Sequence, residues 1–396
     1  MNDEFVSARE AAALLGIRPA SLYAYASRGL LRPEAGAGRE SRYRLAELEA
    51  FRQRRAAARS PRRAARGSLD FGLPVLESRI TLIEGGRLYY RGRDAVALAE
   101  SACLEEVAAL LWDLPPIRLD IPEEELPPCP VAPGFLARAA ILLAESEAMT
   151  EAGLFDRSPA GLARSGLRIL RLGIHAAGGL SRSGTPLHLA LARGWGLDEE
   201  GAALLRAALV LAADHELNPS TFAVRVVAGT GASLQASLAA GLAALSGPRH
   251  GGMTARVEAL LDEIGAAPAQ AALARRLARG EGLPGFGHPL YPDGDPRAVA
   301  LLARLDAARP GPILAHAGGV ARAARLLTGL HPNIDFALVV LRRALGLAEG
   351  AAFAIFAVGR MTGWIAHAME QIGSGEMMRP RAAYAGPRPV RDREGG

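Results

Sequence analysis

Residues 285–297 read GFGHPLYPDGDPR and interrupt a chain that is otherwise apolar and rich in helix-forming alanine and leucine. The stretch sets His288, Asp295 and Arg297 among glycines and prolines, which favour turns and helix boundaries. We therefore expect a loop between helices that carries titratable side chains. A single histidine beside glycines is more often structural than catalytic. This loop therefore indicates a catalytic site only together with other segments like it.

Four further segments of the C-terminal half combine His, Asp or Arg with glycine or proline. They are residues 214–221 (DHELNPST), 247–252 (GPRHGG), 332–336 (PNIDF) and 360–364 (RMTGW), the last followed by Arg379-Pro380-Arg381. Alone, Asp335 would be a helix N-cap and Arg379 part of a solvated tail. Together, in identity, order and spacing, the five segments resemble citrate synthase, and the resemblance covers about residues 70–388.

The chemistry that this resemblance implies explains the residue types. In a Claisen-type condensation, a base removes a proton from the acyl group, while donors stabilise the enolate oxygen and polarise the ketone of oxaloacetate. The resemblance implies that Asp335 is the base, that His250 donates to the thioester oxygen and that His288 donates to the ketone. An ordinary aspartate has a pKa near ~4 and is a weak base at neutral pH. Such a site therefore depends on desolvation and on well-placed donors.

The resemblance also implies how oxaloacetate is held. The residues expected to contact it are His215, Arg297, Arg360 and Arg379. Arginine suits the two carboxylates because its planar guanidinium makes two parallel hydrogen bonds. Arg379 is expected to come from the partner subunit, so that a homodimer shares its active sites.

The acyl-CoA is expected to contact Arg249, Gly251, Gly285 and Gly287, since glycines allow close approach of the backbone. It is a substrate, and no metal or redox cofactor is expected, because the histidines have no metal-ligand spacing. Residues 289–294 depart from the family, since two cations expected near the CoA pyrophosphate are missing. Either Arg249 or another arginine contacts the phosphates, or the pocket has changed. A 2-methylcitrate synthase using propionyl-CoA stays an alternative, because one methylene is worth only roughly 1–3 kcal/mol in a hydrophobic pocket.

The composition predicts a mainly α-helical protein, half hydrophobic and with few β-branched residues. All 46 basic residues are arginine, which excludes a Schiff-base lysine, a lysine-bound pyridoxal phosphate and a P-loop lysine. No apolar stretch reaches the roughly 18 residues of a membrane span, and no secretory signal is visible. Cys103 and Cys129 lie far apart, which indicates a reducing, cytoplasmic setting.

The N-terminal segment differs from the rest in charge. Residues 1–67 hold 14 arginines against 7 acidic residues, which suits a module that faces nucleic acid. Ser7 and Glu10 fit a capping box at the start of a helix, and Gly29 would end a second helix. Residues 5–55 resemble a winged helix-turn-helix of the MerR/excisionase type. The residues implied in DNA contact are Ser21, Tyr23, Arg28, Arg42 and Arg44. The alternative is a small helical docking module with an arginine-rich surface.

We therefore expect a mainly α protein with the citrate synthase fold, a large and a small helical domain, behind an N-terminal winged helix-turn-helix. The expected bounds are 1–55 for the helix-turn-helix, 56–69 for a linker, 70–250 with 346–396 for the large domain, and 251–345 for the small domain. The small domain is expected to close over oxaloacetate, because the site residues are divided between the two domains. A function of another class stays open, namely a DNA-binding regulator whose synthase body senses CoA esters or oxaloacetate.

Overall fold

The computed structural model describes most of the chain, in two compact units, Met1–Ser78 and Arg79–Gly396. The described residues are 5–27, 31, 33–35, 41–44, 48, 51, 76–115, 126–148, 156–180, 184–382 and 384–387. Arg28 and the expected linker, 56–69, lie outside the described residues. Each unit has a hydrophobic core of its own, so each is described by itself.

Among its described residues, the first unit combines two helices with a small antiparallel sheet of strand order β1-β3-β2. Its elements are β1 (Phe5–Ser7), α1 (Ala8–Leu14), α2 (Pro19–Ser27), β2 (Glu34–Ala35) and β3 (Ser41–Arg44). The predicted capping box is confirmed, since the Ser7 hydroxyl accepts the Glu10 N–H while Glu10 accepts the Ser7 N–H. The core consists of Ala11, Ala12, Leu15, Leu22, Leu31, Tyr43, Leu48 and Phe51. Two helices joined by a short turn and followed by a β-wing match the expected winged helix-turn-helix.

The second unit opens with a β-hairpin. Strands β4 (Thr81–Glu84) and β5 (Arg87–Tyr90) pair antiparallel, and β6 (Arg93–Asp94) adds to the edge of β5. Gly85 and Gly86 both have positive φ, as a tight two-residue hairpin turn requires. The hairpin is tied to the helices, because Tyr90 donates its hydroxyl proton to the carbonyl of Val210 at 3.0 Å.

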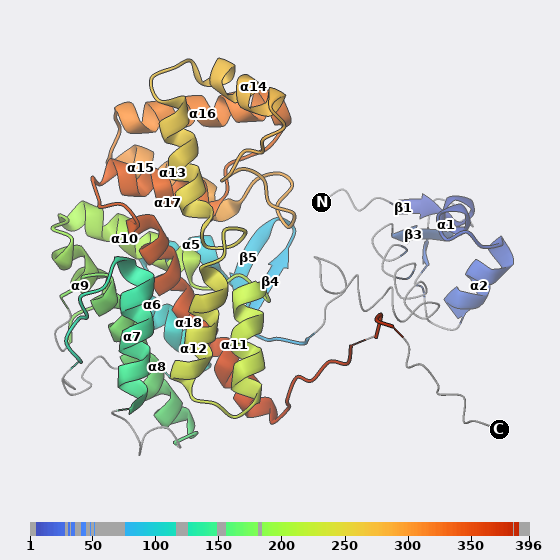
Figure 1. Ribbon diagram of the computed structural model, residues 1–396. Helices are drawn as coiled ribbons and strands as arrows, with labels where there is room; N and C mark the ends of the chain where they lie inside the picture. The colour runs from blue at the N-terminus through green and yellow to red at the C-terminus, as the bar shows by residue number, and fades with distance from the viewer. Residues whose placement is uncertain are drawn as a thin grey trace, which may run out of the picture. The chain divides into compact units, whose positions relative to one another are not determined.

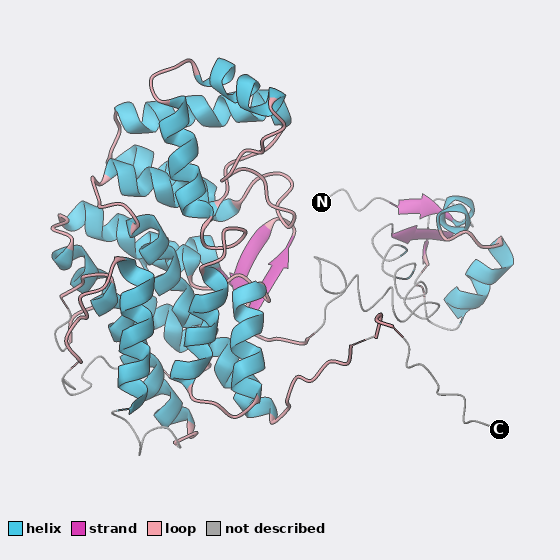
Figure 2. Ribbon diagram, viewed as in Figure 1, coloured by secondary structure: helices cyan, strands magenta, loops and turns pink. Residues whose placement is uncertain are grey.

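The remaining elements of this unit are helices (Figure 2). One group surrounds the long, almost fully buried α18 (Figure 1). This group comprises α5 (Ala95–Ser101), α6 (Leu104–Leu111), α7 (Gly134–Ala148), α8 (Pro159–Ala176), α9 (Leu187–Gly194), α10 (Glu199–Ala212), α11 (Pro219–Gly229), α12 (Leu234–Leu245) and α18 (Ala351–Ser374). Because α18 is apolar on all sides, it forms the centre of the core rather than a surface helix.

A second group of helices lies together at the top of Figure 1. Its members are α13 (Met253–Ile264), α14 (Ala269–Ala278), α15 (Pro296–Ala308), α16 (Pro312–Thr328) and α17 (Ile334–Ala344). They fall within the range expected for a small domain, 251–345, and the movement of that domain stays a prediction. In the part of the chain that the structure describes, no helix has the length and apolar character needed to cross a membrane.

Polar N-caps explain where several of these helices begin. A side-chain oxygen of the cap accepts a backbone N–H of the first turn, which stabilises a helix by about 1 kcal/mol. The caps are Asp94 for α5, Ser158 for α8, Asp198 for α10, Asn218 for α11, Ser233 for α12, Asp295 for α15 and Asn333 for α17. Three of them, Asn218, Asp295 and Asn333, hold the helix starts that carry site residues.

Candidate active site

The five sequence segments supply side chains from loops and helix ends that the fold brings together. His215 lies between α10 and α11, His250 precedes α13, His288 lies in the loop before α15, Arg297 and Asp335 lie in the first turns of α15 and α17, and Arg360 lies in the middle of α18. Segments more than 100 residues apart in sequence thus contribute to one cluster.

Arg360 lies at the centre of the cluster. It is 1% exposed, and its Nε donates to the carbonyl of Ala212 at 2.9 Å. Its Nη2 is buried without a hydrogen-bond partner among the described residues. Burial lowers the pKa of Arg360 to about 10, so it stays a cation at neutral pH. Its charge contributes to the pKa shifts of His215, His250 and Asp335, which shows that these groups lie around it.

Arg297 forms a second buried cation, paired with Asp295. Its Nε and Nη2 donate to the two carboxylate oxygens at 2.9 and 2.8 Å. Burial alone would lower the pKa of Arg297, but the carboxylate outweighs it and raises the pKa. Asp295 also accepts the backbone N–H of Ile334 at 3.0 Å, so it joins the starts of α15 and α17. Nη1 of Arg297 takes no part in this pair.

His215 is positioned by a strained turn. The buried Asp214 carboxylate accepts the Thr81 hydroxyl at 2.6 Å and the Glu216 N–H at 3.1 Å. Glu216 has a φ of +54°, which is unfavourable for a residue with a side chain. Contacts from the β-hairpin and from Asp214 thus hold a conformation that the local sequence would not favour by itself.

His215, His288 and Tyr291 form a cluster of rings. The His215 and His288 ring centroids are 4.9 Å apart, and Tyr291 lies 5.1 Å from His288. His215 Nε2 lies 3.0 Å from the Tyr291 hydroxyl. Burial lowers the pKa of His288 to about 4 and that of His215 well below its usual range, and Arg297 acts in the same direction. Both rings are therefore neutral at pH 7. Tyr291 is not among the residues predicted for the site, although it lies inside the stretch 285–297.

One nitrogen of His288 is already occupied. The backbone N–H of Leu290 donates to Nδ1 at 3.2 Å. A neutral imidazole carries a single proton, so this contact places the proton on Nε2. His288 is therefore a hydrogen-bond donor at Nε2, as the predicted contact with a ketone oxygen requires.

His250 bonds to Ser220, which is buried at the start of α11. The distance from His250 Nε2 to Ser220 Oγ is 2.7 Å, and Trp364 Nε1 donates to the same oxygen at 3.2 Å. Ser220 Oγ also lies 2.7 Å from Asn218 Oδ1. The one hydroxyl proton serves either Asn218 or His250, and this choice decides which ring nitrogen of His250 is protonated. Burial lowers the pKa of His250 to about 4, and Arg360 adds to this.

Asp335 follows the N-cap Asn333, which accepts its backbone N–H at 3.1 Å. Burial raises the pKa of Asp335 to about 7, although the charges on Arg297 and Arg360 act in the opposite direction. The carboxylate is half-buried. It is therefore a stronger base than an ordinary aspartate, and it is substantially ionised at neutral pH.

The three predicted glycines have packing reasons of their own. A Cβ on Gly251 would lie 2.6 Å from the carbonyl oxygen of Leu245, and one on Gly285 would lie 2.6 Å from the Val257 side chain. Gly285 and Gly287 also have φ of +83° and +78°, where side chains are strained. These positions require glycine whether or not a ligand approaches, so their contact with an acyl-CoA stays a prediction.

Two predicted arginines lie on the surface. Arg249 is exposed beside His250, and Arg379 is exposed in the segment that follows α18. Neither belongs to the buried cluster within this chain. Contact of Arg249 with CoA, and of Arg379 with the site of a partner subunit, stay predictions.

Of the residues predicted to contact DNA, Ser21 and Tyr23 lie on α2 and Arg42 and Arg44 lie on β3, and their contact with DNA stays a prediction. Tyr23 on α2 is 54% exposed, and Arg42 and Arg44 are exposed on β3. Arg44 Nε donates to Glu34 at 2.8 Å, and its guanidinium lies 5.5 Å from the Phe5 ring centroid. Ser21 on α2 is half-buried. Arg42 is thus better placed than Arg44 to meet a phosphate, because Arg44 is already engaged.

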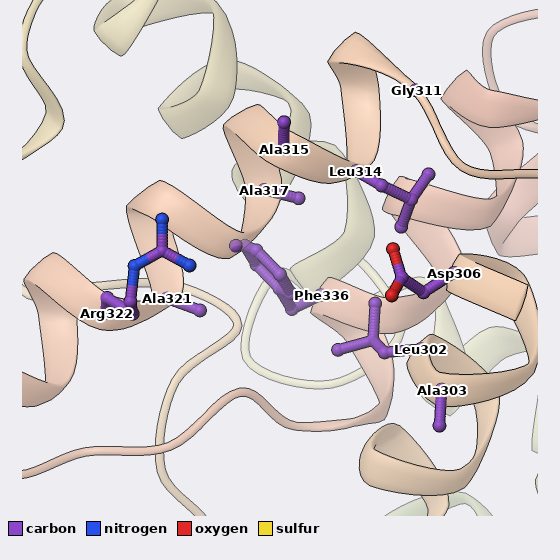
Figure 3. Close-up of a pocket in the computed structure, with 11 residues that line it drawn as sticks. Leu302, Ala303, Asp306, Gly311, Leu314, Ala315, Ala317, Ala321, Arg322 and Phe336 are labelled. Atoms are coloured by element: carbon purple, nitrogen blue, oxygen red, sulfur yellow. The ribbon is translucent and has the colours of Figure 1, made fainter.

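A cavity of about 600 Å³ lies elsewhere, along α15 and α16 (Figure 3). Its lining is mostly alanine, leucine and glycine, with Asp306 and Arg322 at separate places along it. Phe336, the neighbour of Asp335, reaches it, but the histidines and arginines of the cluster do not line it. The candidate active site is therefore the polar cluster and not this cavity.

Comparison with known protein families agrees with this geometry. Residues 179–381 match the family described as citrate synthase, C-terminal domain, and residues 5–56 match a helix-turn-helix domain. The first match begins before His215 and ends after Arg379, so it contains every predicted catalytic and oxaloacetate-binding residue.

Individual relatives extend the match. Citrate synthase 2 of Bacillus subtilis is 38% identical over 186 residues, which is 46% of this chain, and the chain spans about half (50%) of that relative. Citrate synthase of Haloferax volcanii is 30% identical over 365 residues, covering 80% of this chain and 94% of the relative. The crystal structure of citrate synthase from Thermotoga maritima superposes with a TM-score of 0.70 at 28% identity, covering 81% of this chain and 95% of that one. From its sequence, its fold and the residues of this site, the chain belongs to the citrate synthase family.

Proposed function

We propose that this chain condenses an acyl-CoA with oxaloacetate and hydrolyses the thioester, giving citrate and CoA when the donor is acetyl-CoA. The pair of buried guanidinium groups at Arg297 and Arg360 supports this most directly. After the contacts within the described residues are made, Nη2 of Arg360 is buried without a hydrogen-bond partner, while Arg297 uses Nε and Nη2 in its pair with Asp295. A buried cation with unused donors is costly unless an anion binds it, and a dicarboxylate would bind both arginines.

In the proposed complex, the two arginines bind the carboxylates of oxaloacetate, and His215 adds a further contact. His288 donates its Nε2–H to the ketone oxygen, which makes the ketone carbon more electrophilic. The ring is suited to this role because it is neutral and its Nδ1 already accepts the Leu290 N–H. A donor fixed in advance stabilises the developing alkoxide without reorganisation.

Asp335 then removes a proton from the carbon next to the thioester carbonyl. The pKa of Asp335, about 7, lies closer to the pKa of the weak carbon acid than the pKa of an ordinary aspartate does. His250 donates its Nδ1–H to the thioester oxygen, on which negative charge develops; this role requires the Ser220 hydroxyl to give its proton to His250 Nε2. The new carbon–carbon bond forms between this carbon and the ketone carbon, and the ketone oxygen takes up a proton along its hydrogen bond from His288. Water afterwards hydrolyses the thioester and releases CoA.

In the proposed complex, the acyl-CoA contacts Arg249, Gly251, Gly285 and Gly287. Acetyl-CoA is the proposed donor, and propionyl-CoA, which would give 2-methylcitrate, is the alternative. The two differ by one methylene, which a pocket distinguishes by roughly 1–3 kcal/mol.

We propose further that the protein acts as a homodimer in which Arg379 enters the site of the partner subunit. This is supported by the exposure of Arg379 in a segment that continues beyond α18. Within its own chain, Arg379 lies outside the helices and loops that carry the other residues proposed to contact oxaloacetate.

Release of free CoA thiol tests the enzymatic proposal. Purified protein is given oxaloacetate with acetyl-CoA, and separately with propionyl-CoA. We expect release that depends on oxaloacetate, with the larger kcat/KM naming the donor. A folded protein that releases no CoA with either donor would contradict the proposal.

A second function, DNA binding, is proposed for the N-terminal unit. It is supported by the match of residues 5–56 to a helix-turn-helix domain, by the exposed side chains of Tyr23 and Arg42, and by the basic excess of this segment. If the synthase body also acts as a sensor, bound oxaloacetate or acyl-CoA would change the affinity for DNA.

Fluorescence anisotropy with the full chain and a labelled duplex from its own upstream region tests DNA binding. We expect binding that weakens steeply with salt, as release of counterions requires. The Arg42→Ala variant should bind more weakly, whereas Arg193→Ala, at an exposed position of α9, should bind as the unmodified protein does. No binding at low salt would leave the unit as a docking module, and an effect of oxaloacetate would favour the sensor.

A further inference from the structure

Tyr291 connects several residues of the site. Its hydroxyl lies 3.0 Å from His215 Nε2, and the Arg297 guanidinium carbon lies 5.6 Å from its ring centroid. The side chain is 2% exposed and His215 is 7% exposed, so water does not compete for this contact. Because it is shielded from water, the Tyr291 hydroxyl can act only on the groups that it contacts.

The contact has two possible directions, because the phenol and a neutral imidazole can each donate or accept. Burial raises the pKa of Tyr291 to about 12 and lowers that of His215 well below its usual range, so the phenol keeps its proton and the ring has only one. A phenol is a stronger acid than a neutral imidazole N–H, and an imidazole nitrogen is a stronger base than a phenol oxygen. The favourable direction is therefore from the Tyr291 hydroxyl to His215 Nε2.

We propose that Tyr291 is a positioning residue that fixes the neutral tautomer of His215, so that His215 offers an Nδ1–H to a carboxylate of the bound substrate. The identity of that substrate as oxaloacetate rests on the function proposed above. The opposite tautomer would present a lone pair to the carboxylate, and two lone pairs repel each other. Tyr291 thus acts on the substrate through His215.

The contact also joins two parts of the chain that the fold brings together. Tyr291 lies in the range expected for the small domain and His215 in the range expected for the large domain. If the domains separate, His215 loses the hydroxyl and with it the preference for one tautomer. Domain closure and the donor at Nδ1 are then coupled through a single hydrogen bond.

Nitrogen-15 NMR of histidine-labelled protein tests the tautomer without any need for turnover. The ring signals of His215 are assigned by their loss in the His215→Asn variant. We expect the Nδ1–H form in the unmodified protein and a shift towards the Nε2–H form, or a mixture, in Tyr291→Phe. Tyr89→Phe is the matched control, because the Arg87 guanidinium lies 5.7 Å from the Tyr89 ring but no described histidine contacts Tyr89.

Kinetics supply the second readout. Loss of one hydrogen bond of this kind should raise the KM for oxaloacetate by about tenfold in Tyr291→Phe, with a smaller change in kcat. An asparagine at position 215 carries an amide N–H near the place of Nδ1–H and has no tautomers. In the His215→Asn background, Tyr291→Phe should therefore raise KM no further.

Two results would overturn the proposal. One is an unchanged Nδ1–H tautomer in Tyr291→Phe, and the other is an equal KM effect of that substitution with and without His215. A general loss of packing would instead lower the melting temperature and leave the tautomer as it is. Failure of the enzymatic proposal can be distinguished from failure of this one. In that case the unmodified protein would release no CoA, and NMR would still show whether Tyr291 sets the tautomer of His215.

Discussion

At the scale of the residue, burial acts on this site in two directions. It lowers the pKa of His215, His250 and His288, and it raises that of Asp335. Both effects follow from the cost of a charge in a medium of low polarity. The result is a set of neutral hydrogen-bond donors around a carboxylate that is a better base than usual, which is the combination that an enolate-forming step requires.

Asp335 should set the pH dependence of activity. Because the base must be ionised, kcat/KM should fall as the pH decreases through about 7, while the histidines, with pKa near 4 or lower, should not titrate until the solution is far more acidic. Asp335→Asn should lower kcat by about 10²–10⁴-fold and still bind oxaloacetate. Calorimetric titration and CoA release measure the two effects, with Asp306→Asn, on the exposed surface of α15, as the control.

The same substitution should change stability with a definite sign. The folded-state pKa of Asp335 lies above its unfolded value near ~4, so ionisation destabilises the folded protein as the pH rises through this range. Asp335→Asn should therefore raise the melting temperature at pH 8 more than at pH 4. An equal effect at both pH values, or near-normal turnover, would remove Asp335 from the role of base.

Ser220 should matter through His250. Its hydroxyl is the partner of His250 Nε2 and also of Trp364 Nε1, so Ser220→Ala leaves buried polar groups unpaired. An unsatisfied donor costs about 1–3 kcal/mol, and we expect kcat to fall by about 10- to 100-fold. Thr221→Val is the control, because the buried Thr221 hydroxyl has no partner among the described residues. Steady-state kinetics of both variants check this, and equal effects would contradict it.

At the scale of the element, the site depends on how two helices begin. Asp295 caps α15, pairs with Arg297 and accepts the first N–H of α17, so one carboxylate sets the position of both helix starts. The N-termini of helices carry partial positive charge, which favours a carboxylate between them. The placement of Arg297 and of Asp335 relative to each other is therefore fixed by the side chain of Asp295.

Asp295→Asn should destabilise the protein and weaken oxaloacetate binding. The substitution removes the charge that compensates the buried Arg297, and breaking a buried ion pair costs about 3–5 kcal/mol. Denaturant unfolding should show a loss of this size. Asp293→Asn, two residues away and exposed, should have almost none. A stability close to that of the unmodified protein would show that the pair contributes little to folding.

At the scale of the whole molecule, the fold gathers the site from both helix groups, and the proposed dimer adds Arg379 from a second chain. The buried cluster of this chain already contains Arg297 and Arg360, and Nη2 of Arg360 has no hydrogen-bond partner among the described residues. A third arginine from the partner would complete the recognition of a dicarboxylate with a ketone. In that case assembly is a condition of activity and not only of stability.

Mixing two inactive variants tests this arrangement. In a heterodimer of Asp335→Asn and Arg379→Ala chains, an arginine that crosses to the partner leaves one site with both residues intact. A 1:1 mixture that exchanges subunits should then recover roughly a quarter of the unmodified activity, as random pairing predicts. An arginine that serves its own chain would give no recovery. Each variant assayed alone is the control.

The sequence by itself determined the features that depend on near neighbours. The capping box of Ser7 and Glu10 and the hairpin turn at Gly85 and Gly86 follow from contacts within a few residues. The five segments also indicated the family, because a reaction limits which residue types can serve it. The membership and the helical class were predicted correctly on these grounds, and the roles of the His, Asp and Arg residues stay predictions.

Only the tertiary structure decided how those residues behave. The pKa of Asp335, the donor nitrogen of His288, the contact of Tyr291 with His215 and the joining of α15 to α17 by Asp295 were not predicted. Each depends on atoms that the fold brings close from distant parts of the chain or shields from water. Desolvation and the direction of a hydrogen bond are properties of this surrounding structure, and a list of residue types does not contain them.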